Sequence, residues 1–145
     1  MSITQQEYDF LIAQEKVFDE LSEPIILAPP PMEWSRSITA PDTKEKFLLD
    51  FFRSGFELTK YTYNKRYRQT IILVRYDSMG RHTNPDGVTF NGPHVHLYRE
   101  GFNDKFAFPI SELAIDSNDR MNIVLEKLLK YCNVTSVPPI TPPLF

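Results

Sequence analysis

The sequence is poor in the residues that build cross-links and glycine-rich loops. Its 145 residues include one cysteine, Cys132, and five glycines. A single cysteine excludes an internal disulfide, and one thiol cannot form a structural zinc site alone. The glycines do not form a phosphate-cradling loop, and no serine is placed at the sharp turn of a nucleophilic hydrolase. Several common cofactor and catalytic classes are therefore excluded.

Long hydrophobic runs are also missing. No segment approaches the ~20 apolar residues that a membrane-spanning helix requires. The first residues, MSITQQEYDF, lack the basic segment and apolar stretch of a secretory signal. The composition, 41% hydrophobic and 24% charged, is ordinary for a globular protein. We therefore expect a cytoplasmic protein with a single domain over residues 1–136 and a proline-rich tail over 137–145.

Charge is distributed unevenly along the chain. Residues 1–33 carry seven acidic side chains against Lys16 alone, whereas residues 53–81 carry seven basic side chains against Glu57 and Asp77. Such a division can place an anion-binding surface on one side of a protein. It can equally mean that the two regions face each other within the fold.

The pattern of apolar residues predicts an α+β protein. A capping-box spacing from Thr4 to Glu7 and an apolar face that continues to Leu21 predict a helix over about 5–21. Residues 46–77 are rich in the aromatic and β-branched side chains typical of strands, and "HVHLYR" and "KFAFPI" add two more. Apolar spacing over 117–132 predicts a second helix. We expect a mostly antiparallel sheet of four to six strands, with an N-terminal and a C-terminal helix.

All three histidines lie in one short stretch, "HTNPDGVTFNGPHVH", residues 82–96. Alternate residues of a strand share a face, so His94 and His96 are expected on the face opposite Val95 and Leu97. Two imidazoles on one face can bind a metal ion or act together on a phosphate. A structural role also stays open, with His82 in a turn and the other two on an exposed sheet face.

His94, His96 and Glu100 follow the pattern His-x-His-xxx-Glu, which resembles the first metal motif of cupins. No histidine follows His96, so the second motif is missing, and Gly87 is displaced by one position from the glycine of that motif. Glu100 lies in "REG", where the chain is expected to turn away from the sheet. We therefore expect no metal and no other cofactor.

Basic residues surround the histidines and point to phosphate chemistry. If the strands on either side of the histidine loop pair antiparallel, their side chains meet at one end of the sheet. Arg and Lys bind phosphate oxygens, and His exchanges protons at neutral pH, as cleavage of RNA through its 2′-hydroxyl requires. Tyrosines such as Tyr98 could stack unpaired bases. The sequence thus predicts three catalytic residues, which are His82, His94 and His96. It also predicts three phosphate-binding residues, which are Arg75, Arg99 and Lys105.

The run "VRYDSMGRHTNPDGVTFNGPHVHLYREGFNDKFAFP" resembles a family of uncharacterised small proteins from Gram-positive bacteria and their phages. The likeness covers about residues 4–109. A looser similarity links the chain to TumE-type toxins of toxin–antitoxin systems, which place an Arg-Tyr-Asp strand end before a histidine loop and a histidine strand. The paired histidines that those toxins carry directly after the strand are absent here. The residues that match the outline are Arg75, Tyr76, Asp77, His82, His94 and His96.

Two functions of different class follow as hypotheses. The first is an RNA-directed, toxin-like nuclease or nucleic-acid-binding effector of a mobile-element or phage conflict system. The second is a non-enzymatic, phage-encoded inhibitor of a bacterial defence complex, similar in kind to an anti-CRISPR protein, whose acidic N-terminal helix docks on a basic partner. The expected partner is accordingly RNA or a nucleoprotein complex, without a membrane.

Overall fold

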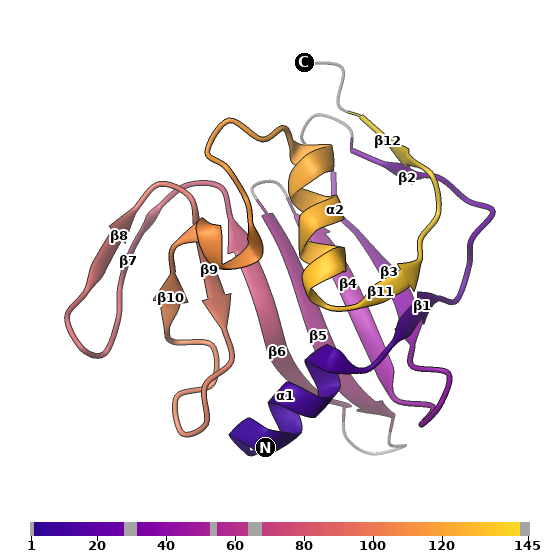
Figure 1. Ribbon diagram of the computed structural model, residues 1–145, viewed down its shortest axis with the longest axis horizontal. Helices are drawn as coiled ribbons and strands as arrows, with labels where there is room; N and C mark the ends of the chain where they lie inside the picture. Colours follow the sequence, from indigo (N-terminus) through magenta and orange to yellow (C-terminus); the bar gives the residue numbers. More distant parts are fainter. Residues whose placement is uncertain (1, 28–31, 53–54, 64–67, 143–145) are drawn as a thin grey trace.

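The computed structural model describes residues 2–27, 32–52, 55–63 and 68–142. These residues form two α-helices, a 3₁₀ helix (Ile110–Leu113) and twelve strands, as Figure 1 shows. The helices are α1 (Gln5–Ala13) and α2 (Met121–Tyr131). The strands are β1 (Lys16–Phe18), β2 (Ile25–Ile26), β3 (Trp34–Thr39), β4 (Lys46–Phe52), β5 (Gly55–Tyr63), β6 (Arg68–Asp77), β7 (Arg81–Thr83), β8 (Thr89–Asn91), β9 (His94–Leu97), β10 (Ala107–Phe108), β11 (Val134–Ser136) and β12 (Ile140–Thr141).

Eight of these strands form the main sheet, in the order β10-β9-β6-β5-β4-β3-β1-β11. Every neighbouring pair is antiparallel except β1 and β11, which run parallel. The predicted α+β class is confirmed. The sheet is larger than the predicted four to six strands because β1 and β11 extend one edge, and such short strands leave little trace in the sequence. The hairpin β7–β8 and the pair β2–β12 form small sheets of their own.

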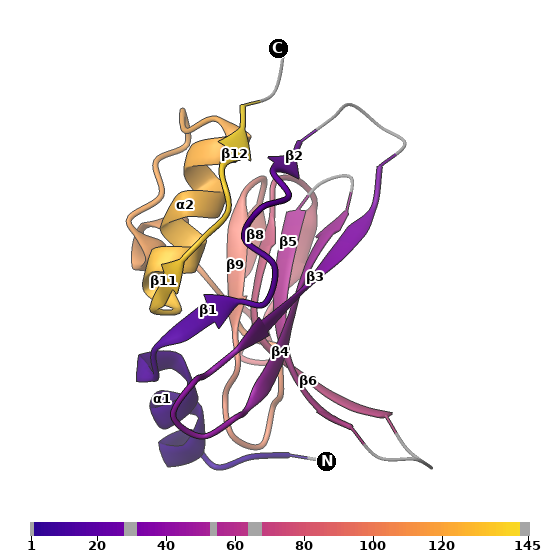
Figure 2. The ribbon, with the colours of Figure 1, turned by 90° about the vertical axis from the view of Figure 1, so that its right-hand side faces the viewer.

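Both helices lie on the same side of the main sheet, as Figure 2 shows. The core lies between them and the sheet, where burying each large apolar side chain contributes about 1.5–3 kcal/mol. Helix α2 supplies Val124, Leu125, Leu128 and Leu129, and the strands supply residues that include Phe47, Leu49, Phe56, Leu58, Leu73 and Val95.

A row of polar residues crosses five strands of the main sheet, from β3 to β9. Its members are direct neighbours in the strand register: Ser35, Asp50, Glu57, Arg75 and His96. Side chains at paired positions of adjacent strands share a face. This row therefore leads across the sheet to the histidine strand β9.

The first helix is shorter than predicted. Thr4 and Glu7 form the expected capping box, but the helix ends at Ala13 and Gln14 is already extended. Residues 16–18 then form β1, which pairs with β3 and β11. The predicted helix over 5–21 is therefore wrong beyond Ala13. The apolar residues that follow serve strand pairing with distant segments, which local periodicity cannot reveal.

The second helix begins later than predicted, at Met121 rather than near residue 117. Asp116 and Asp119 instead accept hydrogen bonds from nearby backbone N–H groups in a turn before the helix. In the tail, Ile140 and Thr141 pair with β2. Residues 143–145 lie outside the described part of the chain.

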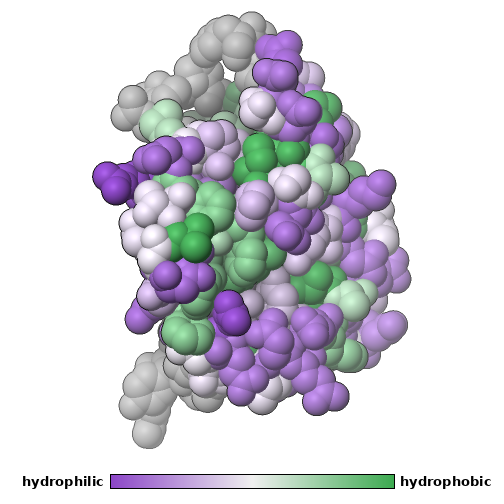
Figure 3. Space-filling model, turned by 60° about the vertical axis from the view of Figure 1, so that its left-hand side comes forward, coloured by the Kyte–Doolittle hydropathy of each residue, from purple (hydrophilic) through white to green (hydrophobic). Residues whose placement is uncertain are grey.

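On the side of the molecule shown in Figure 3, hydrophobic side chains lie in patches between hydrophilic ones. Exposed apolar side chains scattered singly are normal for a folded protein. The large exposed ones in the described chain belong to different elements: Phe10, Leu21, Ile26, Met79, Val88 and Phe102. None of the helices in the described residues has the length and apolar character needed to cross a membrane.

Candidate functional site

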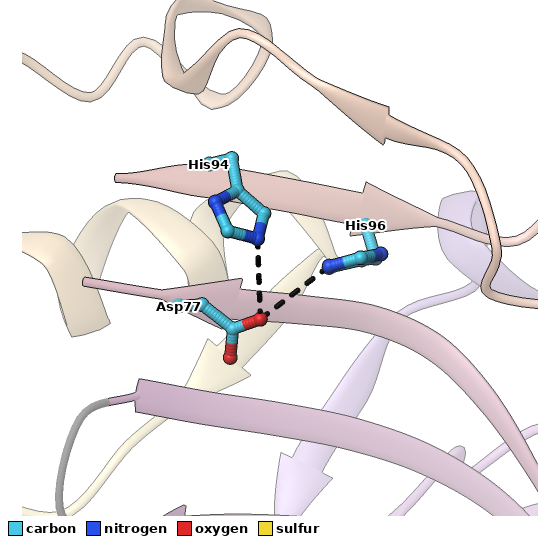
Figure 4. Close-up of side chains that lie close together, drawn as sticks. All are labelled: Asp77, His94 and His96. Atoms are coloured by element: carbon cyan, nitrogen blue, oxygen red, sulfur yellow. Dashed lines mark ion pairs between the residues drawn. The ribbon is translucent and has the colours of Figure 1, made fainter. Parts of the chain in front are cut away.

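The candidate site lies where β6 and β9 pair. The two strands are antiparallel, as the sequence predicted, with Asp77 opposite His94 and Arg75 opposite His96. Because alternate residues share a face, these four side chains project to one side of the sheet, while Val95 is fully buried in the core on the other. Figure 4 shows the Asp77 carboxylate pointing at both imidazoles.

Both strand histidines are buried. His94 is 3% and His96 2% exposed, which corrects the expectation that they sit on an exposed sheet face. The chain after β9 and the hairpin β7–β8 come close to this face: His96 Nδ1 lies 2.8 Å from the Asp104 carbonyl oxygen, and His82 packs against both rings. Polar groups, not aliphatic side chains, make up these contacts.

His82 joins the other two histidines although it belongs to a different sheet. Its ring lies edge-on to His96, with centroids 4.6 Å apart, and stacks on His94 at 6.0 Å. Its Nε2 lies 2.7 Å from the Lys105 carbonyl oxygen. His82 is only partly buried, so it is the member of the trio that reaches solvent. We call Asp77, His82, His94 and His96 the histidine cluster.

Sequence reasoning placed Asp77 at this end of the sheet and in the TumE-type outline, but gave it no catalytic or ligand role. Its Oδ2 lies 3.4 Å from Nε2 of His94 and 3.4 Å from Nε2 of His96. Burial raises the pKa of its carboxyl, but the neighbouring His96 ring and Arg75 guanidinium outweigh this and bring the pKa to about 2. The carboxylate is therefore charged at neutral pH. Its place two residues after Arg75, on the same strand face, was the available signal.

The three predicted phosphate-binding residues do not come together. Arg75 forms ion pairs with Asp77 at 3.0 Å and with Asp104 at 3.5 Å. Arg99 is exposed and lies over the Phe106 ring. Lys105 contributes its backbone carbonyl to His82 while its side chain is exposed. Only Arg75 contacts the carboxylate of the cluster.

Two further predicted features lie elsewhere. Glu100 accepts a hydrogen bond from the backbone N–H of Gln5 at 2.8 Å, so it contacts the start of α1 rather than the histidines. Tyr98 is buried and hydrogen-bonds the backbone of Ile3 through its hydroxyl. The idea that Tyr98 stacks a base is therefore wrong, because β9 ends at Leu97 and the next side chain turns into the core.

The loop between β7 and β8 has the predicted turn. Gly87 adopts a positive φ of 92°, a conformation that glycine takes without a steric penalty. Asn84 is buried, and its side-chain amide pairs with both backbone groups of Ala107. This contact holds the hairpin that carries His82 onto β10.

The cluster contains possible metal ligands. Within the described residues, the one group of at least three side chains whose ligand atoms all lie within 4.8 Å of one another is Asp77, His94 and His96. His82 is not part of it.

Comparison with curated proteins and with solved structures gives no match. One protein-family model matches residues 3–134, which is nearly the whole described chain. That result agrees with the predicted kinship to uncharacterised proteins. By this match the chain belongs to a family of unknown function, DUF6978.

Proposed function

We propose that the protein cleaves phosphodiester bonds in RNA at the histidine cluster, as a toxin-like effector of a mobile-element or phage conflict system. One observation carries the proposal: three imidazoles and a carboxylate from three strands converge beside a partly exposed arginine. Clusters of titratable groups at one end of a sheet are typical of catalytic sites. All three histidines of the sequence lie in this cluster.

Burial divides the roles within the site. Substrate has to touch groups that reach solvent, and these are His82 and Arg75, whose side chain is 34% exposed. A backbone carbonyl oxygen only accepts hydrogen bonds, so Nε2 of His82 donates to Lys105 and Nδ1 stays free to accept one from a substrate. Arg75 can bind a phosphate oxygen through its guanidinium. His94 and His96 are buried and do not contact the substrate directly.

The reaction supported best is transesterification within RNA. The 2′-hydroxyl oxygen attacks phosphorus, the bond from phosphorus to the 5′-oxygen breaks, and the hydroxyl proton ends on that 5′-oxygen. The products are a 2′,3′-cyclic phosphate and a 5′-hydroxyl, so no further reactant is consumed. A cation beside the phosphate stabilises the charge that develops on its oxygens.

Strands β5 and β6, with the sequence between them, support RNA as the substrate. The two strands stay paired as far as Tyr63 and Arg68, about 30 Å along β6 from Asp77. Residues 60–68 contain no acidic residue. Cations interleaved with aromatic rings suit single-stranded nucleic acid. The basic residues of this segment are Lys60, Lys65, Arg66 and Arg68, and its tyrosines are Tyr61, Tyr63 and Tyr67. Lys60 also forms an ion pair with Glu45 at 3.3 Å.

The resemblance to TumE-type toxins is an interpretation of the sequence alone, and it agrees with this proposal. For the non-enzymatic inhibitor the structure offers less support, because α1 ends at Ala13 and the acidic residues spread over several elements. Many of them also have partners within the fold: Glu7 caps α1, Glu15 accepts from Thr135, and Asp19 accepts from Thr39.

The test is cleavage of labelled single-stranded RNA by purified, untagged protein, with DNA of the same sequence as a second substrate. We expect a 2′,3′-cyclic phosphate product from RNA and no cleavage of DNA. Arg75→Gln and His82→Gln should each lower the rate by about a hundredfold. Lys130→Gln removes a cation from the exposed side of α2 and should change nothing.

Induced expression in a bacterial host provides the second readout. Growth arrest that His96→Ala relieves supports a toxin-like nuclease. Harmless expression together with intact RNA in vitro, from a protein that is folded by circular dichroism, would remove the proposal.

A further inference from the structure

The hydrogen bonds of His94 and His96 determine which ring nitrogens carry protons. Nδ1 of His94 lies 2.8 Å from the Gly92 carbonyl oxygen, and Nδ1 of His96 lies 2.8 Å from the Asp104 carbonyl oxygen. Both oxygens can only accept, so each Nδ1 carries a hydrogen. In a neutral imidazole, Nε2 is then left with a lone pair. Two separate backbone contacts thus present both Nε2 atoms as acceptors.

Both Nε2 atoms face the same carboxylate oxygen. Oδ2 of Asp77 lies 3.4 Å from each, and Nε2 of His96 is buried without a hydrogen-bond partner. Nη2 of Arg75 donates to the same oxygen at 3.0 Å, which compensates the carboxylate charge but gives no donor to Nε2 of His96. Electron-rich atoms that converge in a buried place are stabilised by a positive charge between them. The geometry therefore calls for a cation.

Protons alone fit this requirement poorly. A charge-assisted hydrogen bond from an imidazolium to a carboxylate is about 2.7–2.9 Å long, well below the 3.4 Å seen twice here. Two imidazolium rings would also lie with centroids 5.0 Å apart, each almost fully buried beside a like charge. Only one carboxylate oxygen is available to compensate both.

A single metal ion fits the distances. Bonds of about 2.0–2.1 Å from a tetrahedral ion place its ligands about 3.3 Å apart. Two imidazole nitrogens with one carboxylate oxygen form a ligand set for zinc and related transition metals, whereas calcium and magnesium prefer oxygen ligands. A carbonyl that accepts from Nδ1 is the usual outer contact of a metal-binding histidine.

We propose that Nε2 of His94, Nε2 of His96 and Oδ2 of Asp77 bind one divalent transition metal ion of the zinc class. Three protein ligands leave a coordination position for water or a phosphate oxygen, as in catalytic rather than structural zinc sites. Arg75 donates to the same Oδ2 through Nη2 at 3.0 Å and to Oδ1 through Nε at 3.3 Å, and so holds the carboxylate in place. The inference rests on the proposed function for the use of this metal in phosphate chemistry, but not for its binding.

The sequence led us to expect no metal because Glu100 would turn away from the histidines. Glu100 does bind the start of α1 instead. The third ligand comes from the neighbouring strand, where Asp77 lies directly opposite His94. A motif confined to one strand could not reveal it.

The experiment is a titration of the full, chelator-treated protein with Co²⁺, followed by visible absorption. We expect one equivalent to bind with the intense bands of four-coordinate cobalt, and Zn²⁺ to displace it. A hundredfold excess of Zn²⁺ over its Kd should raise the melting temperature by about 5–10 °C. A folded wild-type protein that binds no stoichiometric Co²⁺ overturns the inference.

Two matched variants locate the ion. Asp77→Asn should lower the affinity for Co²⁺ by at least about a hundredfold, while the metal-free protein keeps its fold because the amide can donate to a histidine Nε2. Asp104→Asn removes a carboxylate that pairs with Arg75 but leaves the backbone carbonyl under His96, and it should bind Co²⁺ normally. Equal binding by both variants would place the ion elsewhere and contradict the inference.

The two proposals can fail separately. Metal binding without RNA cleavage removes the proposed substrate and leaves the metal site. RNA cleavage that persists in protein shown to bind no metal removes the metal site and leaves the nuclease.

Discussion

Two groups of buried polar side chains in this protein serve opposite purposes. The first, which we call the lysine cluster, is the Lys16 ammonium with the carbonyl oxygens of Ile12, Gln14 and Cys132. Nζ of Lys16 donates to all three, at 3.1, 2.8 and 2.6 Å. Three donors meet three acceptors, so the lysine cluster is complete by itself.

Three members of the histidine cluster, Asp77, His94 and His96, are also buried, but their hydrogen bonding is incomplete. Nε2 of His94, Nε2 of His96 and Oδ2 of Asp77 are all acceptors when the two rings are neutral. Oδ2 accepts from Arg75, whereas Nε2 of His96 has no hydrogen-bond partner. A satisfied buried network holds segments together, whereas convergent unsatisfied acceptors indicate a ligand. Burial of a polar group alone therefore does not identify a site, whereas the balance of hydrogen-bond donors and acceptors does.

The largest expected effect comes from breaking the lysine cluster. Lys16→Met leaves three buried carbonyls without a donor and should lower the free energy of unfolding by about 3 kcal/mol. Burial lowers the pKa of Lys16 to about 8. The hydrogen bonds of its ammonium group connect α1, β1 and the end of α2. Denaturant melts measure the loss.

Lys130→Met is the control for that change. Lys130 is exposed on α2, so its replacement should alter stability by no more than about 0.5 kcal/mol. The Lys16 variant, where it folds, should bind Co²⁺ like the wild type. A loss below about 1 kcal/mol would mean that the lysine cluster does not stabilise the fold as its hydrogen bonds indicate.

The hairpin over the histidine cluster gives the next effect. Asn84→Ala removes a hydrogen bond at each of the two Ala107 backbone groups, at 3.0 and 2.7 Å, and should destabilise the protein by about 2 kcal/mol. The three proposed ligands lie on β6 and β9, so affinity for Co²⁺ should persist. Thr83→Ala, at an exposed neighbour, should be nearly neutral. A variant that keeps full stability would show that Asn84 does not anchor the hairpin.

The smallest effect lies outside both clusters, at the pair Asp50 and Glu57. These carboxylates are directly opposite on β4 and β5, an arrangement that is unfavourable by several tenths of a kcal/mol. Burial and the Asp50 charge raise the pKa of Glu57. A carboxyl whose pKa is raised by folding disfavours the folded state increasingly as pH rises through that pKa.

Glu57→Gln should therefore stabilise the protein by about 0.5 kcal/mol at pH 7 and by less near pH 4. Melts at the two pH values measure the difference, with the exposed Glu126→Gln as control. A gain that is equal at both pH values would contradict the charge-based account.

The histidine cluster shows how far sequence reasoning could reach. The antiparallel pairing of β6 and β9 followed from strand-like composition on both sides of a turn, and it brought Arg75 next to His96 as predicted. Arg99 and Lys105 were expected at the same place because they flank β9, but both residues are exposed. Proximity in sequence indicates which end of a sheet a residue reaches, not where its side chain points.

From the sequence alone we predicted the α+β class, the strands β4 to β6, the start of α1 and the buried face of α2. These depend on local periodicity, capping and turn residues, which act over a few neighbouring positions. Contacts between distant segments place Lys16 in a strand beside β11 and bury His94 and His96. Such contacts also bring the Asp77 carboxylate against both histidines. These features depend on contacts between segments that are far apart in the sequence. The residues next to a given position do not indicate which distant segment will pair with it or bury it.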